Sequence, residues 1–333
     1  MRYVVTGASG HIGSNLVRHL LHQGHDVRVL CFRDSTYIDG LPVERVDGDV
    51  RDPASLRAAI ADREILVHLA AIISIDQRDH PLMQATNVEG VRNVAEVALE
   101  SGIRRMIHVS STHAYETWRI GRPLDETGAK CEGPPHPGYD CSKAAGEKAL
   151  REVIARGLDA VILNPSGVIG PLDHRPSHIG RVLQHLYRGW TPMVPRGGFV
   201  WVDVREILAC ISNAVEHGRR GENYLLGSEY ATIKDFAGII ASTYGWKDRV
   251  IEFDPSLLRP LVGLSRIASS ITGGRRSFTR DTFHALTSEL ELDTSKAREE
   301  LGFKPRPLRE TVADTLSWYI ERGVLPARKP IGG

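Results

Sequence analysis

The sequence predicts an α/β protein, in which a doubly wound parallel sheet is followed by a smaller C-terminal α+β lobe. Three observations lead to this fold class. Short apolar segments alternate with amphipathic segments over the first half of the chain, which is typical of a parallel sheet covered by helices. A glycine-rich turn at residues 6–13 joins the first pair of segments. Beyond Pro171 the alternation becomes irregular, which indicates a separate lobe.

The elements of the main sheet follow from these patterns in chain order. Apolar runs predict strands at residues 2–5, 26–32, 43–46, 64–69, 105–109 and 158–163. Helical periodicity predicts helices at 12–23, 53–61, 81–101 and 139–156. A late strand near 223–226 is expected to return to the same sheet. Residues 1–170 and this strand would then form the first domain, and residues 171–330 would mainly form the second lobe.

Beyond the sixth strand, periodicity predicts the elements of the second lobe. Helices are expected at 177–187, 204–216, 232–244, 255–272, 280–286 and 308–322, with short strands near 199–202 and 250–253. Residues 116–138 are rich in glycine, proline and charge, and predict a long loop. Long loops in a compact domain are usually functional or mobile.

The composition is that of an ordinary globular protein, with 25% charged residues, 41% hydrophobic residues and a formal net charge of +1. This balance gives no general attraction to nucleic acid or to anionic membranes. No apolar run is long enough to span a membrane, and the first strand begins too early for a leader peptide. The four cysteines follow no metal-ligand or disulfide spacing. We therefore expect no metal and a cytoplasmic protein.

The turn Thr6-Gly7-Ala8-Ser9-Gly10-His11-Ile12-Gly13 lies between a strand and a helix, the context in which spaced glycines indicate a Rossmann dinucleotide site. One glycine permits the tight turn, a second lets the pyrophosphate approach the backbone, and a third lets the helix pack closely on the strand. The first N–H groups and the positive end of the helix dipole then bind the phosphates. The residues expected in this contact are Gly7, Ser9, Gly10, His11, Ile12 and Gly13.

The end of the second strand bears on which dinucleotide binds. An acidic residue there would bind the ribose hydroxyls of NAD, whereas an arginine accommodates the extra phosphate of NADP. Cys31 stands at the usual position of the acid and Arg33 follows two residues later, which favours NADP. Two alternatives stay open: Arg33 is a solvated loop charge, or Asp34 reaches a ribose.

Further cofactor contacts are expected where later strands end. Asp49, followed by Val50, can meet the adenine edge or instead start the next helix. Leu69, Ala70 and Ala71 end the fourth strand, and the two alanines are small enough to let the backbone lie against a cofactor.

Ser111, Tyr139 and Lys143 form the predicted catalytic group. Ser111 follows the fifth strand, and the four-residue spacing puts Tyr139 and Lys143 on one face of a helix. A lysine cation would lower the tyrosine pKa from about 10, so that the phenol could exchange a proton with a carbonyl or alcohol oxygen oriented by Ser111. A second Tyr-x-x-x-Lys, from Tyr230 to Lys234, lies beyond the sixth strand and is expected to be structural.

These motifs together resemble the extended short-chain dehydrogenases/reductases, the superfamily of NAD-dependent epimerases and dehydratases, over nearly the whole chain. Residues 164–171, 279–281 and 293–305 are similar to its dihydroflavonol-reductase and hydroxysteroid-dehydrogenase branch. The resemblance implies a Rossmann fold, catalysis by the three residues above, and homodimers formed through the helices at 81–101 and 139–156. It also implies a cofactor site that includes Asn87, Tyr139, Lys143 at the nicotinamide ribose, and Pro165, Gly167 and Val168 against the nicotinamide.

One departure from the family pattern follows Ser111. Sugar-nucleotide dehydratases of the family carry an Asp-Glu pair there, whereas this chain has Thr112-His113, which argues against dehydration. The candidate substrate residues are His113, Ser166 and His174. Packing roles remain an equal alternative for His113, and a solvated helix face remains an alternative for His174.

The leading functional hypothesis is an NAD(P)-dependent oxidoreductase that transfers a hydride between nicotinamide and a ketone or secondary alcohol. The alternative is a sugar-nucleotide epimerase with a tightly held cofactor, and a third hypothesis is a dinucleotide-sensing protein without turnover. Val168, Ile169 and the apolar segment 257–271 favour an apolar substrate. Arg275 and Arg276 could instead bind a diphosphate, but they follow Gly273-Gly274, and a solvated loop is the role we favour for them.

Overall fold

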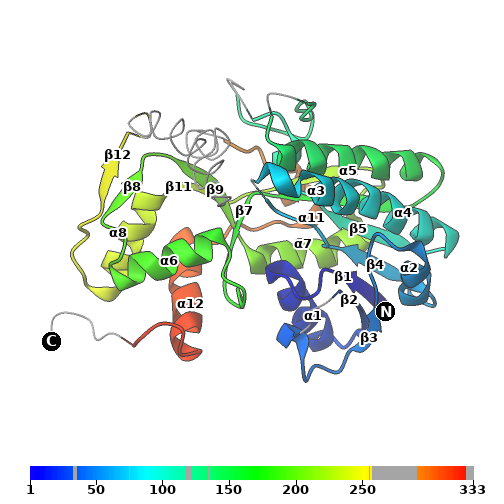
Figure 1. Cartoon of the computed structure of the whole chain (residues 1–333), viewed down its shortest axis with the longest axis horizontal. Coiled ribbons are helices and arrows are strands. Elements are labelled where there is room, and N and C mark those ends of the chain that lie inside the picture. The colour runs from blue at the N-terminus through cyan, green and yellow to red at the C-terminus, as the bar shows by residue number, and fades with distance from the viewer. Residues whose placement is uncertain are drawn as a thin grey trace.

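Among the described residues, seven strands form the main sheet in the order β10-β6-β5-β4-β1-β2-β3 (Figure 1). The computed structural model describes residues 1–32, 36–74, 76–117, 122–133, 136–254, 256 and 291–327. The strands are β1 (Arg2–Thr6), β2 (Asp26–Cys31), β3 (Glu44–Asp47), β4 (Ile65–His68), β5 (Arg105–Val109), β6 (Ala160–Pro165) and β10 (Asn223–Leu226). Every neighbouring pair is parallel, which confirms the predicted fold class.

Helices cover both faces of this sheet. The helices α1 (His11–His22) and α7 (Val204–His217) pack on one face, and α2 (Pro53–Ile60), α4 (Gly90–Glu100) and α5 (Gly138–Ala155) pack on the other. The neighbours Val4 and Val5 belong to opposite cores because side chains alternate along a strand. Burial on both faces explains why the strands are continuous apolar runs in the sequence.

The helix expected at 81–101 is interrupted. The structure has α3 (His80–Met83), then a π-helical segment η3 (Gln84–Glu89), and only then α4. The π turn includes Asn87, whose side chain accepts a hydrogen bond from the Ile72 N–H and donates to the Ile72 carbonyl and to the Ser142 hydroxyl. Apolar periodicity reports only which face is buried, so it could not reveal this wider turn.

The second lobe contains two small sheets, seen to the left in Figure 1. One consists of β7 (Gly167–Ile169), β9 (Gly198–Asp203) and β11 (Glu229–Thr232), and the other of β8 (Met193–Pro195) and β12 (Ile251–Phe253). Helices α6 (His178–Arg188), α8 (Ile233–Tyr244) and α12 (Leu308–Glu321) share an apolar core with them.

Three strands and one helix of this part were not predicted. The strands β7, β8 and β11 have three or four residues, too few to show a period of two. We expected residues 164–171 to break regular structure, but β6 continues to Pro165 and β7 pairs with β9. The missed helix, α11 (Ser295–Leu301), packs through Ala297 and Leu301 on the core that contains α7. The helices predicted at 255–272 and 280–286 fall almost wholly outside the described residues.

Within the described ranges, no helix is long and apolar enough to cross a membrane.

We predict that Gly146→Ala destabilises the protein. A Cβ at this position of α5 would lie 2.2 Å from the Asn87 carbonyl oxygen, so the helix and η3 would have to separate. Overpacking of this kind costs about 1–3 kcal/mol, although alanine is the better helix former by about 1 kcal/mol. Urea unfolding measures the change. The control is Lys148→Ala on the exposed side of α5, and equal stability of the two variants would contradict the contact.

Candidate cofactor and active site

The predicted site residues lie at one edge of the main sheet. Thr6, Asp47, His68, Val109 and Pro165 end β1, β3, β4, β5 and β6. Because these strands are parallel, their carboxyl ends lie at the same edge, and the segments that follow them meet there. The sheet order reverses between β1 and β4, and ligands of open α/β sheets bind at such a point.

The glycine loop has the geometry that a dinucleotide requires. Gly7 has a φ of +72°, and a Cβ there would lie 2.7 Å from the Ala70 nitrogen, so this loop packs directly on the end of β4. A Cβ on Gly13 would lie 2.2 Å from the Gly7 carbonyl oxygen, which is the close helix–strand contact expected of the third glycine. Gly10 is the N-cap of α1, and its first turn has no side-chain cap and no acidic residue. These features fit the pyrophosphate of a dinucleotide.

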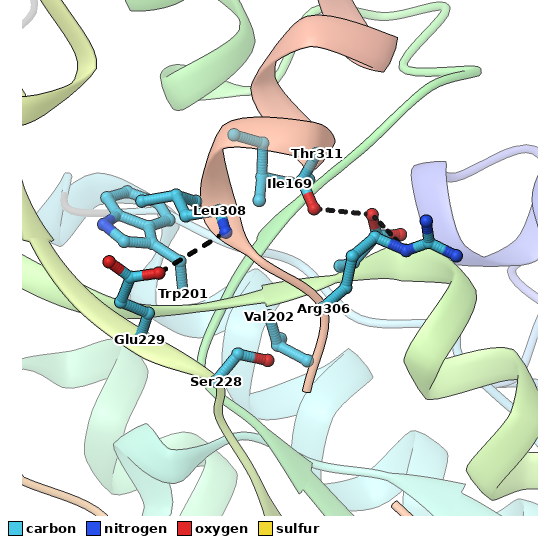
Figure 2. Close-up of a pocket in the computed structure, with 9 residues that line it drawn as sticks. Ile169, Trp201, Val202, Ser228, Glu229, Arg306, Leu308 and Thr311 are labelled. Carbon is cyan, nitrogen blue, oxygen red and sulfur yellow. Dashed lines mark hydrogen bonds and ion pairs between the residues drawn. The ribbon is translucent and has the colours of Figure 1, made fainter. Parts of the chain in front are cut away.

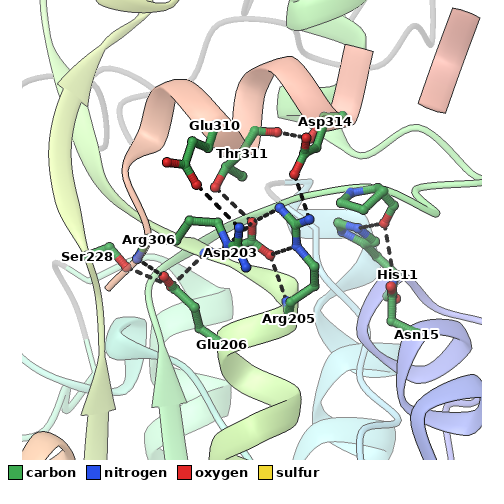
Figure 3. Close-up of polar contacts among 12 residues, drawn as sticks. His11, Asn15, Asp203, Arg205, Glu206, Ser228, Arg306, Glu310, Thr311 and Asp314 are labelled. Carbon is green, nitrogen blue, oxygen red and sulfur yellow. Dashed lines mark hydrogen bonds and ion pairs between the residues drawn. The ribbon is translucent and has the colours of Figure 1, made fainter. Parts of the chain in front are cut away.

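Two side chains of the loop have structural partners. His11 donates through Nε2 to the Pro171 carbonyl at 2.9 Å, and Asn15 donates to the same oxygen at 3.1 Å (Figure 3). Ile12 packs against the core on the α1 face, whereas Ser9 is partly exposed between the glycines. The His11 and Asn15 side chains of α1 thus bind the segment that follows β7. The backbone N–H groups at the start of α1 are left to bind a cofactor.

After β3, Asp49 is paired with Arg51, a residue that the sequence analysis did not single out. Arg51 Nε donates to both carboxylate oxygens of Asp49, at 3.0 and 2.9 Å, and its guanidinium lies 5.7 Å from the Phe32 ring centroid. Asp52, rather than Asp49, caps α2 by accepting from two backbone N–H groups. Val50 is buried. Arg33 and Asp34 lie outside the described residues.

Ser111, Tyr139 and Lys143 come together at this edge. Ser111 is buried, and its hydroxyl, which accepts a hydrogen bond from the His113 N–H at 3.2 Å, lies near the Tyr139 phenol. Lys143 is 4% exposed and donates through Nζ to the Val109 carbonyl at 3.3 Å. Burial lowers the pKa of Lys143 to about 8, and the Glu147 carboxylate opposes this shift.

The tyrosine differs from the prediction in one respect. We expected the Lys143 cation to lower the pKa of Tyr139, but burial and the neighbouring Asp140 carboxylate raise it, and only the nearby Ser111 hydroxyl opposes them. The physical reason is that a buried phenolate loses its hydration, and the Lys143 cation does not offset that loss.

His113 lies beside Tyr139. Its Nδ1 is 3.1 Å from Asp140 Oδ1, and its ring meets the Tyr139 ring edge-on at 5.7 Å between centroids. Burial lowers the pKa of His113, but the hydrogen bond and charge of Asp140 outweigh it and leave this pKa raised. The imidazole is therefore held in a defined orientation next to the phenol.

The other candidate substrate and nicotinamide residues are divided between two places. Ser166 follows Pro165 at the sheet edge, and its buried hydroxyl has no hydrogen-bond partner among the described residues. A Cβ on Gly167 would lie 2.7 Å from the Trp201 ring, so this glycine is required for packing. His174, in contrast, stacks on Tyr37 and meets Trp318 edge-on, and no contact brings it to Tyr139 in the described part of the chain.

The remaining cofactor candidates act through backbone or packing. Leu69 and Ala70 donate their N–H groups to the Thr6 hydroxyl, each at 3.3 Å, and Ala71 continues this segment. Asn87 holds the Ile72 backbone, and Val168 packs against the core on the α1 face.

A shallow hollow, too narrow to hold a water molecule, lies elsewhere, between β7, β9 and the start of α12 (Figure 2). Its lining consists of Ile169, Trp201, Val202, Asp203, Ser228, Glu229, Arg306, Leu308 and Thr311. None of the predicted catalytic residues is among them. Its polar groups are engaged with one another, since Thr311 donates to Asp203 at 2.8 Å and the Leu308 N–H donates to Glu229 at 3.4 Å. We interpret it as a packing gap.

The same region connects the second lobe to the main sheet. The buried Asp203 carboxylate accepts from Arg205 Nε at 2.9 Å and from Thr311, and Arg205 also donates to Asp314 of α12 at 2.6 Å (Figure 3). Glu206, in the first turn of α7, accepts from the Ser228 hydroxyl at 2.7 Å. These ion pairs fasten α12 to the junction of β9 and α7.

Comparison with known proteins identifies the class of this chain. Residues 3–227 match the family described as NAD dependent epimerase/dehydratase family, and the chain belongs to that family. This confirms the resemblance inferred from the motifs and makes the protein a nicotinamide-dependent enzyme with oxidoreductase-type chemistry.

Three known proteins are similar to it over most of their length. Sterol demethylase protein B of Methylococcus capsulatus is 35% identical over 340 residues, which cover 98% of this chain and 100% of that protein. A putative dihydroflavonol 4-reductase of Synechocystis sp. is 29% identical, covering 96% of this chain and 95% of the other. The crystal structure of gox2253 has a TM-score of 0.85 and 31% identity, and covers 97% of this chain and 99% of that one.

Proposed function

We propose that this enzyme transfers a hydride between a nicotinamide cofactor and a ketone or secondary alcohol on a largely apolar, ring-containing compound. The observation that carries the proposal is that Ser111 and Tyr139 meet next to the buried Lys143 at the sheet edge, with the Ser111 hydroxyl close enough to the phenol to oppose the rise of its pKa. Two polar hydroxyls at that point can bind one carbonyl oxygen.

In the direction of ketone reduction each residue has a defined task. The bound reduced nicotinamide supplies the hydride that adds to the carbonyl carbon. Ser111 donates a hydrogen bond to the carbonyl oxygen, and Tyr139 gives its proton to that oxygen as the negative charge develops. The raised pKa of Tyr139 keeps the phenol protonated at neutral pH, which suits a proton donor. The Lys143 ammonium stabilises the phenolate that remains and holds the nicotinamide ribose.

The proposed substrate class rests on the residues around this group. Where dehydratases have an Asp-Glu pair, this chain has Thr112 and a His113 held by Asp140. We propose that His113 and Ser166 contact the substrate, and His174 stays a weaker candidate. Two of the relatives are named for a sterol and a dihydroflavonol, which are both ring compounds. Two further features bear on the substrate class but lie outside the described residues. They are the apolar segment 257–271 and the pair Arg275–Arg276.

We further propose NADP(H) as the preferred cofactor, since Cys31 ends β2 where an acid would select NAD. Residues 1–170 with β10 are proposed to bind it, and residues 171–330 to form most of the substrate lobe. A homodimer through the α4 and α5 helices follows from the family resemblance, and a cytoplasmic location follows from the composition.

The mechanism predicts that Tyr139→Phe lowers turnover by roughly 100- to 10,000-fold, because a positioned proton donor is removed. Cofactor binding should change little, since the ring remains. The matched control is Tyr230→Phe. Tyr230 lies in β11 and Lys234 in α8, where it pairs with Asp248 at 2.7 Å, so the second Tyr-x-x-x-Lys does not share a helix face. Steady-state kinetics that show the greater loss in Tyr230→Phe would refute the assignment.

The substrate class predicts which compounds are converted. Purified enzyme with saturating NADP(H) should show hydride transfer at about 340 nm, the band of reduced nicotinamide, with cyclic and aromatic ketones or secondary alcohols. A parallel panel of UDP-, GDP- and dTDP-sugars should show neither epimer formation nor thermal stabilisation. Stabilisation or epimerisation with the sugar panel alone would favour the epimerase instead.

The cofactor preference predicts that NADP(H) binds more tightly than NAD(H) in fluorescence titrations. Arg33→Ala should weaken NADP(H) selectively, by about 1.5–3 kcal/mol for one lost charge-assisted contact. NAD(H) binding that is equal to or tighter than NADP(H) binding in the wild type would show that the preference is wrong.

A further inference from the structure

Helix α5 carries a third polar residue in line with the proposed catalytic pair. Tyr139, Lys143 and Glu147 follow one another at intervals of four residues, so they lie along one face of the helix. Glu147 is 1% exposed, and Lys143 is 4% exposed. A buried carboxylate one turn beyond a buried ammonium calls for an explanation, because each charge is costly to remove from water.

The Glu147 carboxylate is fully engaged. Lys130 donates to Oε2 at 2.6 Å, Asn223 donates to Oε2 at 3.0 Å, and Asn164 donates to Oε1 at 2.6 Å. Burial raises the pKa of Glu147, but Lys130 and these hydrogen bonds outweigh burial and hold the pKa below its ordinary value. The group is therefore an anion at neutral pH. Lys130 also lies over the Tyr115 ring at 3.2 Å, which fixes its position from the other side.

The same network reaches Ser111. The side-chain NH₂ group of Asn164 donates to the Ser111 backbone carbonyl at 2.9 Å as well as to Glu147. Asn223 in turn donates to the side-chain oxygen Oδ1 of Asn164 at 2.7 Å. The orientation of the Asn164 amide is thus determined by Glu147 on one side and by the Ser111 backbone on the other. A change at Glu147 would remove one of the contacts that orient the Asn164 amide toward the Ser111 backbone.

The other groups that face Lys143 supply no negative charge to it. His68 of β4 and His108 of β5 lie under α5 on the same face of the sheet, fully buried, with their rings stacked at 5.3 Å. Burial and the nearby Lys143 charge lower the pKa of both imidazoles, so both are neutral. Tyr139, on α5 itself, is neutral as well. Glu147 is the anion whose charge favours the protonated form of Lys143.

We propose that Glu147 is a positioning residue of the reaction, which keeps the Lys143 ammonium charged beside Tyr139 and, through Asn164, orients the backbone of Ser111. The inference rests on the proposed function for the role of Lys143, although the electrostatic effect itself can be measured without any substrate. The competing explanation is purely structural: Glu147 would serve only to neutralise Lys130 and so to attach its loop to α5.

Two variants separate these explanations. In Glu147→Gln the half-buried Lys130 ammonium remains without its anion, so the protein should lose stability. In the double variant Glu147→Gln with Lys130→Met both charges are absent, and stability should largely return. If Glu147 acts on Lys143, the Lys143 pKa should fall by about one unit in both variants, because the favourable charge is missing in each. The matched control is Glu152→Gln, an exposed glutamate of α5 paired with Arg92 at 2.6 Å, which should change nothing.

The readout is the titration of the ¹³Cε resonance of Lys143 in labelled protein, assigned by its loss in Lys143→Arg. The alkaline limb of the pH–turnover profile for ketone reduction should move to lower pH by the same amount. A double variant that regains stability and titrates as the wild type would overturn the proposal and leave Glu147 a structural residue. If no carbonyl compound is turned over by the wild type, the proposed function fails, while the Lys143 titration still decides this inference.

Discussion

Burial of the Lys143 ammonium is the constraint on which much of the site depends. A cation removed from water must either lose its proton or receive compensation from its surroundings. The chain compensates it with the Val109 carbonyl and with the Glu147 carboxylate one turn along α5. The histidines of β4 and β5 that lie nearby stay neutral and so add no second positive charge. The result is a lysine with a pKa of about 8, which is still largely charged at neutral pH but close to titration.

Close backbone packing brings the elements of the site within reach of one another. Gly7 lies against the end of β4, Gly13 against the Gly7 carbonyl, and Gly146 of α5 against the Asn87 carbonyl of η3. Each contact would be blocked by a single methyl group. The π turn at η3 serves the same end, because it lets Asn87 hold the Ile72 backbone and the Ser142 hydroxyl together. These glycines and Asn87 thus set the spacing between the elements of the site.

The second lobe is attached by charge rather than by apolar packing alone. Asp203 and Glu206 at the start of α7 accept hydrogen bonds from Arg205, Thr311 and Ser228, which come from three different segments. The region resembles a pocket in outline, yet its polar groups are already paired. The chemistry is therefore better sought at the carboxyl edge of the main sheet, where the Ser166 hydroxyl is buried without a partner in the described residues.

The sequence by itself determined the parallel α/β sheet, the glycine loop and the grouping of Ser111 with Tyr139 and Lys143. These features depend on local spacing: alternation within a strand, four residues along a helix, and glycines in one turn. Only the tertiary structure decided which way the Tyr139 pKa moves, where His174 lies, and that Glu147 and the Ser111 backbone share the Asn164 amide. The physical reason is that burial and charge at a given atom are sums over distant segments. Lys130, Asn164 and Asn223 donate hydrogen bonds to Glu147 from different parts of the chain. No local sequence pattern predicts these contacts.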